Sequence, residues 1–334
     1  MSLPEPLWIT EADVACLVDM ADAIAALEHG FRELAAGRAE TMTKTHLLWD
    51  GSSTLNALGA VFPSLGVAGT KTWTNAAAKS APLVTMWDSR DGSLLAIIEA
   101  SLLGQLRTGA SAGLATRWLA DRRADDFALI GAGKQALMQL AAVAAVRDLR
   151  RVRVWSRDFA RASAFAVEAG RELGLRVEPV ASVEAAVKDA PIVTVVTRAT
   201  RPVLFGAMLA RGAHVNAMGA VSPERQEFEP ALLARCATVM TDSVPQVRQL
   251  SSEFIEHFGD NQAAWRKVLT YAEVAKAGAV RPAGADLTLA KPMGVGLADL
   301  SMGIEIRRRA QEQGLGRRFP QPTKAKPRLL RAKV

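Results

Sequence analysis

Apolar residues between positions 10 and 37 recur at the three- and four-residue spacing of one helix face. Thr10, with Asp13 three positions later, is a candidate N-cap, and Gly37 marks the end of the pattern. Asp19 is a candidate second cap. We therefore expect helix over residues 10–37 with an interruption near Asp19. The apolar positions of the buried face are Val14, Leu17, Val18, Ile24, Leu27 and Phe31.

Residues 41–100 follow a different pattern, because short apolar runs alternate with turn signals such as Asp50-Gly51. The run LVTMW (83–87) and the run LLAII (94–98) flank the turn SRDGS (89–93), which is typical of a β-hairpin. This part is expected to be an antiparallel sheet rather than a series of βαβ units.

A helical stretch over 102–120 leads into a regular alternation of buried strands and helices. The strands are expected at 126–130, 151–155, 176–180, 191–197, 214–219 and 238–242, with helices up to about 146, over 159–173 and over 182–188. This alternation predicts the α/β class, with a doubly wound parallel sheet. Two further helical stretches are expected, at about 261–277 and 298–313.

The strand at 126–130 is followed by a glycine-rich turn of the form GxGxxA that opens a helix. It consists of Gly131, Ala132, Gly133, Lys134, Gln135 and Ala136. Gly131 permits a tight turn, Gly133 lets a pyrophosphate approach the backbone, and Ala136 allows close packing of helix and strand. The helix start offers free N–H groups to phosphate. A Rossmann dinucleotide site is therefore predicted here.

The residues after the second strand bear on which dinucleotide is bound. NAD-selective sites usually place an acidic residue here to bind the ribose 2′-OH, but this chain has Ser156 and Arg157, with Arg161 one helical turn later. A guanidinium suits a 2′-phosphate. Asp158 is the rival residue, but it stands past the usual position. NADP(H) is predicted as the preferred cofactor, and NAD(H) stays possible.

Composition narrows the class of protein. The chain has 334 residues, 49% of them hydrophobic, enough for about two domains. Its two cysteines, Cys16 and Cys236, belong to no metal-ligand pattern, so no metal is expected. There is no signal-peptide pattern and no apolar run of about 20 residues, which favours a cytoplasmic protein without a membrane partner.

The net charge of +7 lies largely in the last 18 residues, which carry seven Lys/Arg and no acid. Such a tail can bind nucleic acid or acidic lipid. Its three prolines favour a solvated, poorly ordered terminus instead, and nothing else in the chain resembles a nucleic-acid reader. We expect residues 321–334 to be a disordered basic tail and expect no nucleic-acid partner.

Five segments together resemble the ornithine cyclodeaminase/mu-crystallin family over about residues 10–315. They are GTKTWTN (69–75), LRTGASAG (106–113), LIGAGKQA (129–136), VNAMGAVSPERQEFEP (215–230) and KPMGVGLADL (291–300). The resemblance implies a substrate-binding and dimerisation domain of α+β type (1–120 plus 299–320) with an NADP-binding Rossmann domain (121–298) inserted in it. It also implies a homodimer and an active site in the cleft between the domains.

The resemblance further implies roles for individual residues. Lys71 would face the substrate as the catalytic residue, Lys44 and Arg107 would bind its carboxylate, and Met293 would lie near it. The cofactor contacts implied are Thr197, Val215, Asn216, Ala217, Met218 and Arg225. Three cations in one cleft suit a carboxylate-bearing substrate, and a lysine there is expected to have a lowered pKa. The substrate side chain would meet apolar residues, with Trp49, Phe62, Trp73 and Met293 as candidates that equally suit core or dimer interface.

One departure bears on the reaction. The cyclodeaminases and alanine dehydrogenases of the family have an acid/base aspartate where this chain has Val221, which cannot transfer a proton. The sequence therefore favours the mu-crystallin-like branch: an NADPH-dependent reductase of a small carboxylate-bearing imine (a ketimine), giving an amino acid. A cyclodeaminase-type lyase, an NAD-dependent amino-acid dehydrogenase, and an NADP(H)-dependent ligand-binding protein without turnover remain the alternatives.

Overall fold

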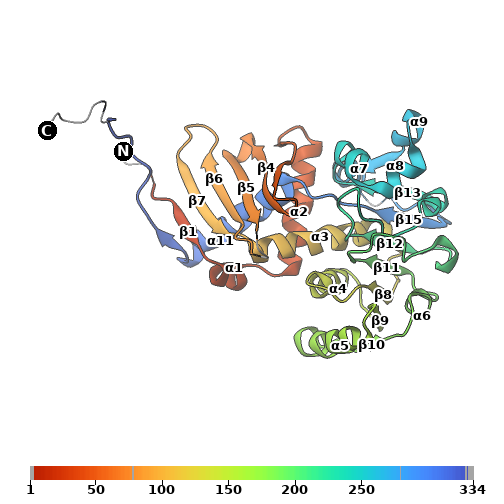
Figure 1. Cartoon of the computed structure of the whole chain (residues 1–334). Coiled ribbons are helices and arrows are strands. Elements are labelled where there is room, and N and C mark those ends of the chain that lie inside the picture. The colour runs from red at the N-terminus through yellow and green to blue at the C-terminus, as the bar shows by residue number, and fades with distance from the viewer. Residues whose placement is uncertain (1–3, 77–78, 279, 328, 330–334) are drawn as a thin grey trace.

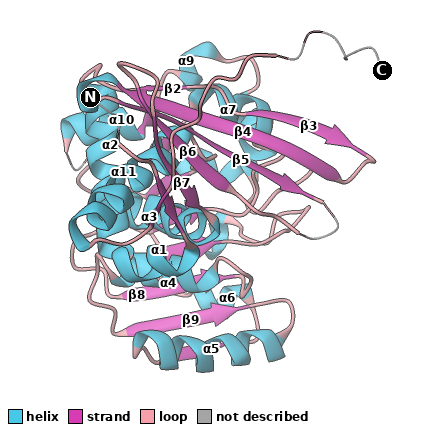
Figure 2. Ribbon diagram, turned by 90° about the vertical axis from the view of Figure 1, so that its left-hand side faces the viewer, coloured by secondary structure: helices cyan, strands magenta, loops and turns pink. Residues whose placement is uncertain are grey.

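The computed structural model describes residues 4–76, 79–278, 280–327 and 329. Two sheets organise this part of the chain, and the long helix α3 (Ser101–Leu119) runs from one to the other (Figure 1). Viewed from the side, α3 and α4 (Ala136–Ala144) lie between the first sheet and the strands β8 (Asp126–Ile130) and β9 (Arg151–Trp155) of the second (Figure 2). Helix α3, which carries Arg107, and strand β8, which leads into the glycine-rich turn, therefore both lie where the two sheets meet.

The first sheet is largely antiparallel, as predicted for residues 41–100. Its order is β16-β1-β7-β6-β5-β4-β2, and β3 also pairs with β4. The predicted hairpin is confirmed in β6–β7, where Trp87 pairs with Leu94. Two strands at one end of the sheet were not predicted: β1 is parallel to β7, and the edge strand β16 is antiparallel to β1. The strands are β1 (Leu7–Ile9), β2 (Glu40–Thr41), β3 (Thr45–Trp49), β4 (Ser53–Phe62), β5 (Val67–Asn75), β6 (Leu83–Asp88), β7 (Leu94–Glu99) and β16 (Arg317–Arg318).

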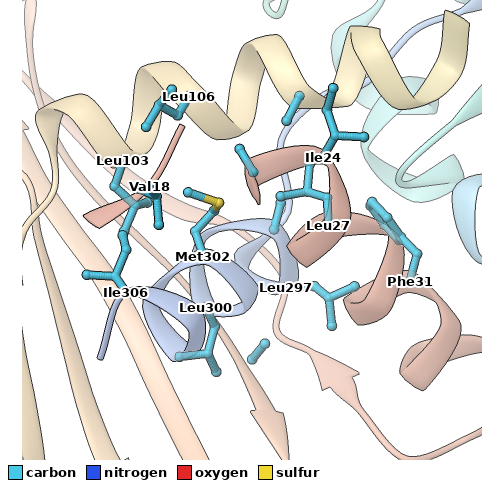
Figure 3. Packing of buried hydrophobic residues seen from close by; sticks show 14 of the residues in the cluster. Val18, Ile24, Leu27, Phe31, Leu103, Leu106, Leu297, Leu300, Met302 and Ile306 are labelled. Carbon is cyan, nitrogen blue, oxygen red and sulfur yellow. The ribbon is translucent and has the colours of Figure 1, made fainter. Parts of the chain in front are cut away.

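Three helices, α1 (Glu11–Leu17), α2 (Met20–Ala35) and α11 (Gly296–Gln313), pack beside this sheet together with α3. The predicted interruption at Asp19 is confirmed, because Thr10 and Asp19 each form a capping box with the aspartate three residues on. Apolar side chains of α2, α3 and α11 interlock in one core (Figure 3). That core includes Ile24, Leu27, Phe31, Leu103, Leu106, Leu297, Leu300 and Met302.

The second sheet is a doubly wound, all-parallel Rossmann sheet, which confirms the predicted class. Its order is β10-β9-β8-β11-β12-β15-β13-β14, and separate apolar clusters cover its two faces. The strands are β8 (Asp126–Ile130), β9 (Arg151–Trp155), β10 (Val177–Pro179), β11 (Ile192–Val195), β12 (His214–Ala217), β13 (Cys236–Thr241), β14 (Val268–Thr270) and β15 (Leu287–Ala290). The helices are α4, α5 (Phe159–Leu173), α6 (Val183–Val187), α7 (Val244–Leu250), α8 (Ser252–Phe258), α9 (Gln262–Trp265) and α10 (Tyr271–Ala277), with 3₁₀ turns at Gly206–Met208 and Pro230–Arg235.

The prediction of one helix over 261–277 is wrong. The segment holds α9, then the edge strand β14, then α10. Thr270 and Glu273 form a capping box, so a new helix begins where a continuous one was expected. The four-residue strand β15 was also missed; it is fully buried on both faces, and so short an apolar run has no periodicity to reveal it.

The C-terminal segment returns to the first sheet. β16 pairs with β1, and the Gln321 amide donates to the carbonyl of Pro4 at 2.8 Å and accepts from Leu94 N at 3.1 Å. Part of the expected basic tail, residues 328 and 330–334, lies outside the described residues. Within the described ranges, no helix is long and apolar enough to cross a membrane.

Candidate functional site

The strand β5 turns Lys71 toward the helices. Lys71 pairs with Leu58 on one side and Val84 on the other, and Val84 is a core residue beneath α11. Residues in register share a face of the sheet, so the Lys71 side chain enters the protein, where it is 5% exposed. Trp73 follows two residues later on the same face, and its ring centroid lies 4.9 Å from Lys71 Nζ. The lysine is therefore a buried cation with an aromatic ring against it.

The start of α11 brings a carboxylate to this lysine. A Cβ at Gly296 would lie 2.3 Å from the carbonyl oxygen of Gly59, so only glycine allows the helix to begin directly on β4. One turn into α11, Asp299 Oδ1 accepts a hydrogen bond from Lys71 Nζ. Asp299 was missed by the sequence reasoning, although it lies within the segment KPMGVGLADL; an acid in the first turn of a buried helix was the available signal.

Two further predicted residues join the same cluster. Arg107, on α3, places its Nε 3.3 Å from Asp299 Oδ1, and Lys44 Nζ lies 5.9 Å from the Trp73 ring centroid. Asp242, directly after β13, completes the cluster and was also missed. Its two carboxylate oxygens accept from the backbone N–H groups of Met293 and Gly294 at 2.7 and 2.8 Å. The Met293 side chain is buried, as expected near a site.

The protonation behaviour of the cluster follows from its burial. Burial lowers the pKa of Lys71 to about 8, against the opposing effect of the Asp299 carboxylate. Burial and then the Arg107 guanidinium lower the pKa of Lys44, while burial raises the pKa of Asp242. Three cations and two carboxylates leave one net positive charge when all are ionised. The arrangement can bind a carboxylate and can hold or release a proton near neutral pH.

The predicted glycine-rich turn has the geometry that a dinucleotide requires. Gly131 has φ +118°, its N–H donates to the carbonyl of Trp155 at 2.8 Å, and a Cβ there would lie 2.6 Å from the Val196 carbonyl oxygen. A Cβ at Gly133 would instead point into open space in front of α4, whose start has no side-chain cap. Free N–H groups facing that space fit a pyrophosphate. Lys134 and Gln135 lie in the turn, Ala132 is half-buried, and Ala136 is fully buried against the strand.

Ser156, Arg157 and Arg161 lie after β9, where the ribose of a dinucleotide is expected in this fold. Arg157 is exposed. The rival residue, Asp158, is occupied as the N-cap of α5, where it accepts from Ala160 N at 3.0 Å, and it lies 3.6 Å from Arg161 Nε. The Asp158 carboxylate is thus occupied in capping α5, whereas Arg157 is exposed to solvent.

A buried glutamate organises the ends of β11 and β12. Glu227 accepts from Thr197 N (2.5 Å) and Thr197 Oγ1 (2.9 Å), and also from Gly219 N (2.6 Å) and Ala220 N (2.8 Å). Burial raises its pKa, and Lys291 Nζ donates to the carbonyl of Ala220 from the other side. Thr197 was predicted as a cofactor contact. Glu227 was not, although it is the acid within VNAMGAVSPERQEFEP.

Three of the predicted cofactor residues, all on β12, have fully buried side chains. Val215 and Ala217 belong to the hydrophobic core, because alternate positions of β12 face it. Asn216, on the other face, bonds to Thr116 Oγ1 and the His214 ring at 3.0 Å each. Met218 follows the strand end. Arg225 is half-buried, and its side chain forms no hydrogen bond or ion pair with the other described residues.

The apolar residues predicted for the substrate pocket do not all lie near the charged cluster. Trp73 contacts both lysines, and Met293 is buried beside the Asp242 loop. Phe62 is 1% exposed within the core between α2 and the sheet, so it is a core residue. Trp49 is 40% exposed on β3. Val221 is half-buried against the core of the Rossmann domain.

Fold and site define a two-part α/β protein with a Rossmann turn and a buried lysine–carboxylate centre. The family model of the ornithine cyclodeaminase/mu-crystallin family matches residues 5–314, and the chain belongs to that family. The identification made from five short segments is thereby confirmed.

Named relatives give the same result. A Δ1-pyrroline-2-carboxylate reductase of Bacillus cereus is 30% identical, over 91% of this chain and 96% of the relative. The structure of the Thermococcus litoralis Δ1-pyrroline-2-carboxylate reductase, in complex with NADH and L-proline, is similar with TM-score 0.86 and 25% identity, over 93% of this chain and 99% of that one. An archaeal alanine dehydrogenase dimer with bound NAD is similar with TM-score 0.85 and 25% identity, over 95% and 99%.

Proposed function

We propose that this protein is a nicotinamide-dependent reductase of a small imine that carries one carboxylate, and that its product is an amino acid. The observation that carries the proposal is the buried Lys71, with a pKa of about 8, beside the carboxylate-binding candidates Arg107 and Lys44. Two of the similar proteins described above are pyrroline-2-carboxylate reductases, which supports the same reaction class. Pyrroline- and piperideine-2-carboxylate are the first substrates to test.

The charge of the site suggests the charge of the substrate. One carboxylate would neutralise the net positive charge that the three cations and two acids leave, whereas a dicarboxylate would overcompensate it. Arg107 and Lys44 would hold this group, with the guanidinium able to bind it through two parallel hydrogen bonds. We therefore expect a monocarboxylate substrate.

The reaction needs one hydride and one proton. The turn at Gly131–Ala136 would hold the pyrophosphate of a nicotinamide dinucleotide, which would supply the hydride for the imine carbon. The Lys71 ammonium gives its proton to the imine nitrogen, so that the C=N bond becomes CH–NH and the lysine is left neutral until solvent reprotonates it. A single donor is sufficient for this. Deamination would require further proton transfers, and Val221 offers no group for them.

The cofactor form proposed is NADP(H), with NAD(H) as the alternative. Asp158 is occupied as the N-cap of α5, and Arg157 is exposed. Both observations support a 2′-phosphate over a 2′-hydroxyl. The similar structures named above carry NADH and NAD, so the preference is a property to be measured for this chain.

The proposed assembly is a homodimer through the domain formed by residues 1–120 and 299–320, with residues 121–298 binding the cofactor. Helices cover the face of the first sheet that bears Val84. On the opposite face Trp8, Ile97, Thr85 and Thr70 lie in register and are only half-buried. A second copy of this face would cover it, and the archaeal alanine dehydrogenase is a dimer.

The test is a panel of cyclic and acyclic imines with NADPH and NADH, together with 2-oxo acids plus amines, followed by cofactor oxidation. Reduction of 2-carboxylated imines, and not of the same rings without the carboxylate, supports the proposal. Ammonia release from ornithine with NAD would replace it by the cyclodeaminase reaction. Binding of NADPH without turnover of any compound would replace it by a ligand-binding role.

A further inference from the structure

Lys71 and Arg107, although they lie on different elements, converge on the same atom. Both approach Oδ1 of Asp299, Lys71 through a hydrogen bond and Arg107 Nε at 3.3 Å. The other oxygen, Oδ2, is buried and has no hydrogen-bond partner among the described residues. A carboxylate placed only to neutralise two cations would be expected to use both oxygens, so the convergence on one oxygen needs a reason beyond charge balance.

Stability alone does not explain this buried cluster. Replacing a buried ion pair by apolar residues of similar volume is often neutral or stabilising, because desolvation offsets the attraction. The chain nevertheless keeps Asp299 at 1% exposure, at the start of α11, where the helix dipole favours a negative charge. The close approach of Gly296 to Gly59 then holds that charge against Lys71.

We propose that Asp299 is the positioning residue of this site: it keeps Lys71 protonated and fixes the proton donor at a set distance from the guanidinium that binds the substrate carboxylate. This inference rests on the proposed function, because it assigns Lys71 as donor. The fixed separation of the Lys71 ammonium and the Arg107 guanidinium suits substrates whose nitrogen and carboxylate are attached to the same carbon. In this proposal Asp299 acts through Lys71 and Arg107, and not on the substrate itself.

The charges around Lys71 support this role. The groups that face it are Asp299 from α11, Arg107 from α3 and Lys44 from the segment before β3, and Asp242 acts on the latter two. Among the groups that affect Lys71 itself, only Asp299 favours its charged form; burial, Arg107 and Lys44 all oppose it. Without the carboxylate, the pKa of Lys71 would fall further, so a smaller fraction of the lysine would carry a proton to donate at neutral pH.

The structure provides an optical probe for this titration. The Trp73 ring centroid lies 4.9 Å from Lys71 Nζ, close enough for the charge of the ammonium to act on the indole. The difference in fluorescence between the parent protein and Trp73→Phe, recorded against pH without substrate or cofactor, isolates this one tryptophan from the other six. Lys44 Nζ also lies near this ring, at 5.9 Å, so the alkaline midpoint that is absent in Lys71→Met reports the protonation of Lys71.

The experiment compares Asp299→Asn with Asp299→Glu, using Ser301→Ala on the same helix as the matched control. In Asp299→Asn we expect the fluorescence midpoint and the alkaline limb of kcat/KM to move down together by about 1–3 pH units. Asp299→Glu, which keeps the charge, should move both by less than Asp299→Asn, and Ser301→Ala should move neither. An unchanged midpoint in folded Asp299→Asn would overturn the proposal even if imine reduction is found. A shifted midpoint without any imine reduction would leave it standing and refute the reaction.

Asp299→Asn leaves a buried lysine unpaired and is expected to have a lower Tm. A second comparison therefore tests the pairing through stability, in case the single variant folds poorly. The double variant Lys71→Met/Asp299→Asn removes both charges of the hydrogen-bonded pair. We expect it to recover at least half of the fall in Tm that Asp299→Asn causes. A double variant with no recovery would contradict the pairing of these two residues as the purpose of Asp299.

Discussion

Lys71 and Asp299 are 228 residues apart in the sequence, yet the Lys71 ammonium donates to Asp299 Oδ1 in the interior of the protein. The contact joins the middle of the first sheet to the first turn of the last long helix. It places a lysine with a pKa of about 8 in a cluster that also holds Arg107 and Lys44.

Replacement of Lys71 by methionine, which has a similar length and no charge, should abolish imine reduction. Loss of a general acid typically costs about 10²–10⁴-fold in rate, which sets the expected fall in kcat. NADPH binding should be unchanged within about threefold, because the lysine lies on β5, a strand of the first sheet, and the cofactor turn belongs to the second. Steady-state kinetics and a fluorescence titration with NADPH measure the two effects. Undiminished reduction in the variant would remove Lys71 as the proton donor.

The pH dependence of kcat/KM should show an alkaline limb near pH 8. Burial lowers the pKa of Lys71 from its ordinary value of 10.5 to about 8, so the donor is charged below this pH and is lost as the pH rises through it. Activity should therefore be flat at neutral pH and fall about tenfold per unit well above pH 8. A profile that stays level to pH 10 would mean that no group with this pKa gives the proton.

Arg157→Ala tests the cofactor preference. A charge-assisted hydrogen bond contributes about 1.5–3 kcal/mol, so the variant should bind NADPH about ten- to a hundredfold more weakly and NADH almost as before. Arg171→Ala, on the same helix α5, is the matched control, because that guanidinium is exposed and pairs with Glu172. Equal losses for the two cofactors in Arg157→Ala would refute a 2′-phosphate contact at this residue.

The protein should be a homodimer in solution. The face of the first sheet with Trp8 and Ile97 is only half-buried in one chain, and a second copy would bury it. Light scattering at micromolar concentration should give twice the mass of 35.6 kDa, and Ile97→Lys should lower it to that of one chain. Arg308→Ala, on the exposed side of α11, should leave the mass unchanged. A monomer with intact activity would contradict the proposed assembly.

The sequence predicted the fold class, the interrupted first helix, the hairpin and most strands of the Rossmann sheet. These features depend on local signals: period-2 or helical patterns, caps and turn residues. The continuous helix over 261–277 failed because an edge strand of three residues carries too little pattern, even though Thr270 and Glu273 marked a helix start. The strand β15 was not predicted for the same reason, because it has only four residues.

The site was predicted in part. The sequence predicted Lys44, Lys71 and Arg107, and these residues lie together. It did not predict Asp242 and Asp299, which complete the cluster. Their importance depends on packing between α11, β5 and the end of β13, which no local pattern encodes. The side-chain directions of Val215 and Asn216 could not be predicted for a related reason, since a strand that is buried on both faces looks uniform in sequence.

The central claim is that hydride reaches the carbon of a carboxylate-bearing imine, and isotope transfer tests it most directly. The protein is incubated with pyrroline-2-carboxylate and NADPH deuterated at C4 of the nicotinamide, with the 4R and 4S forms used separately. Mass spectrometry should find proline with one deuterium at Cα from one of the two forms and none from the other, without ammonia release. Absence of deuterated product with either form, for this imine and for piperideine-2-carboxylate, would contradict the account.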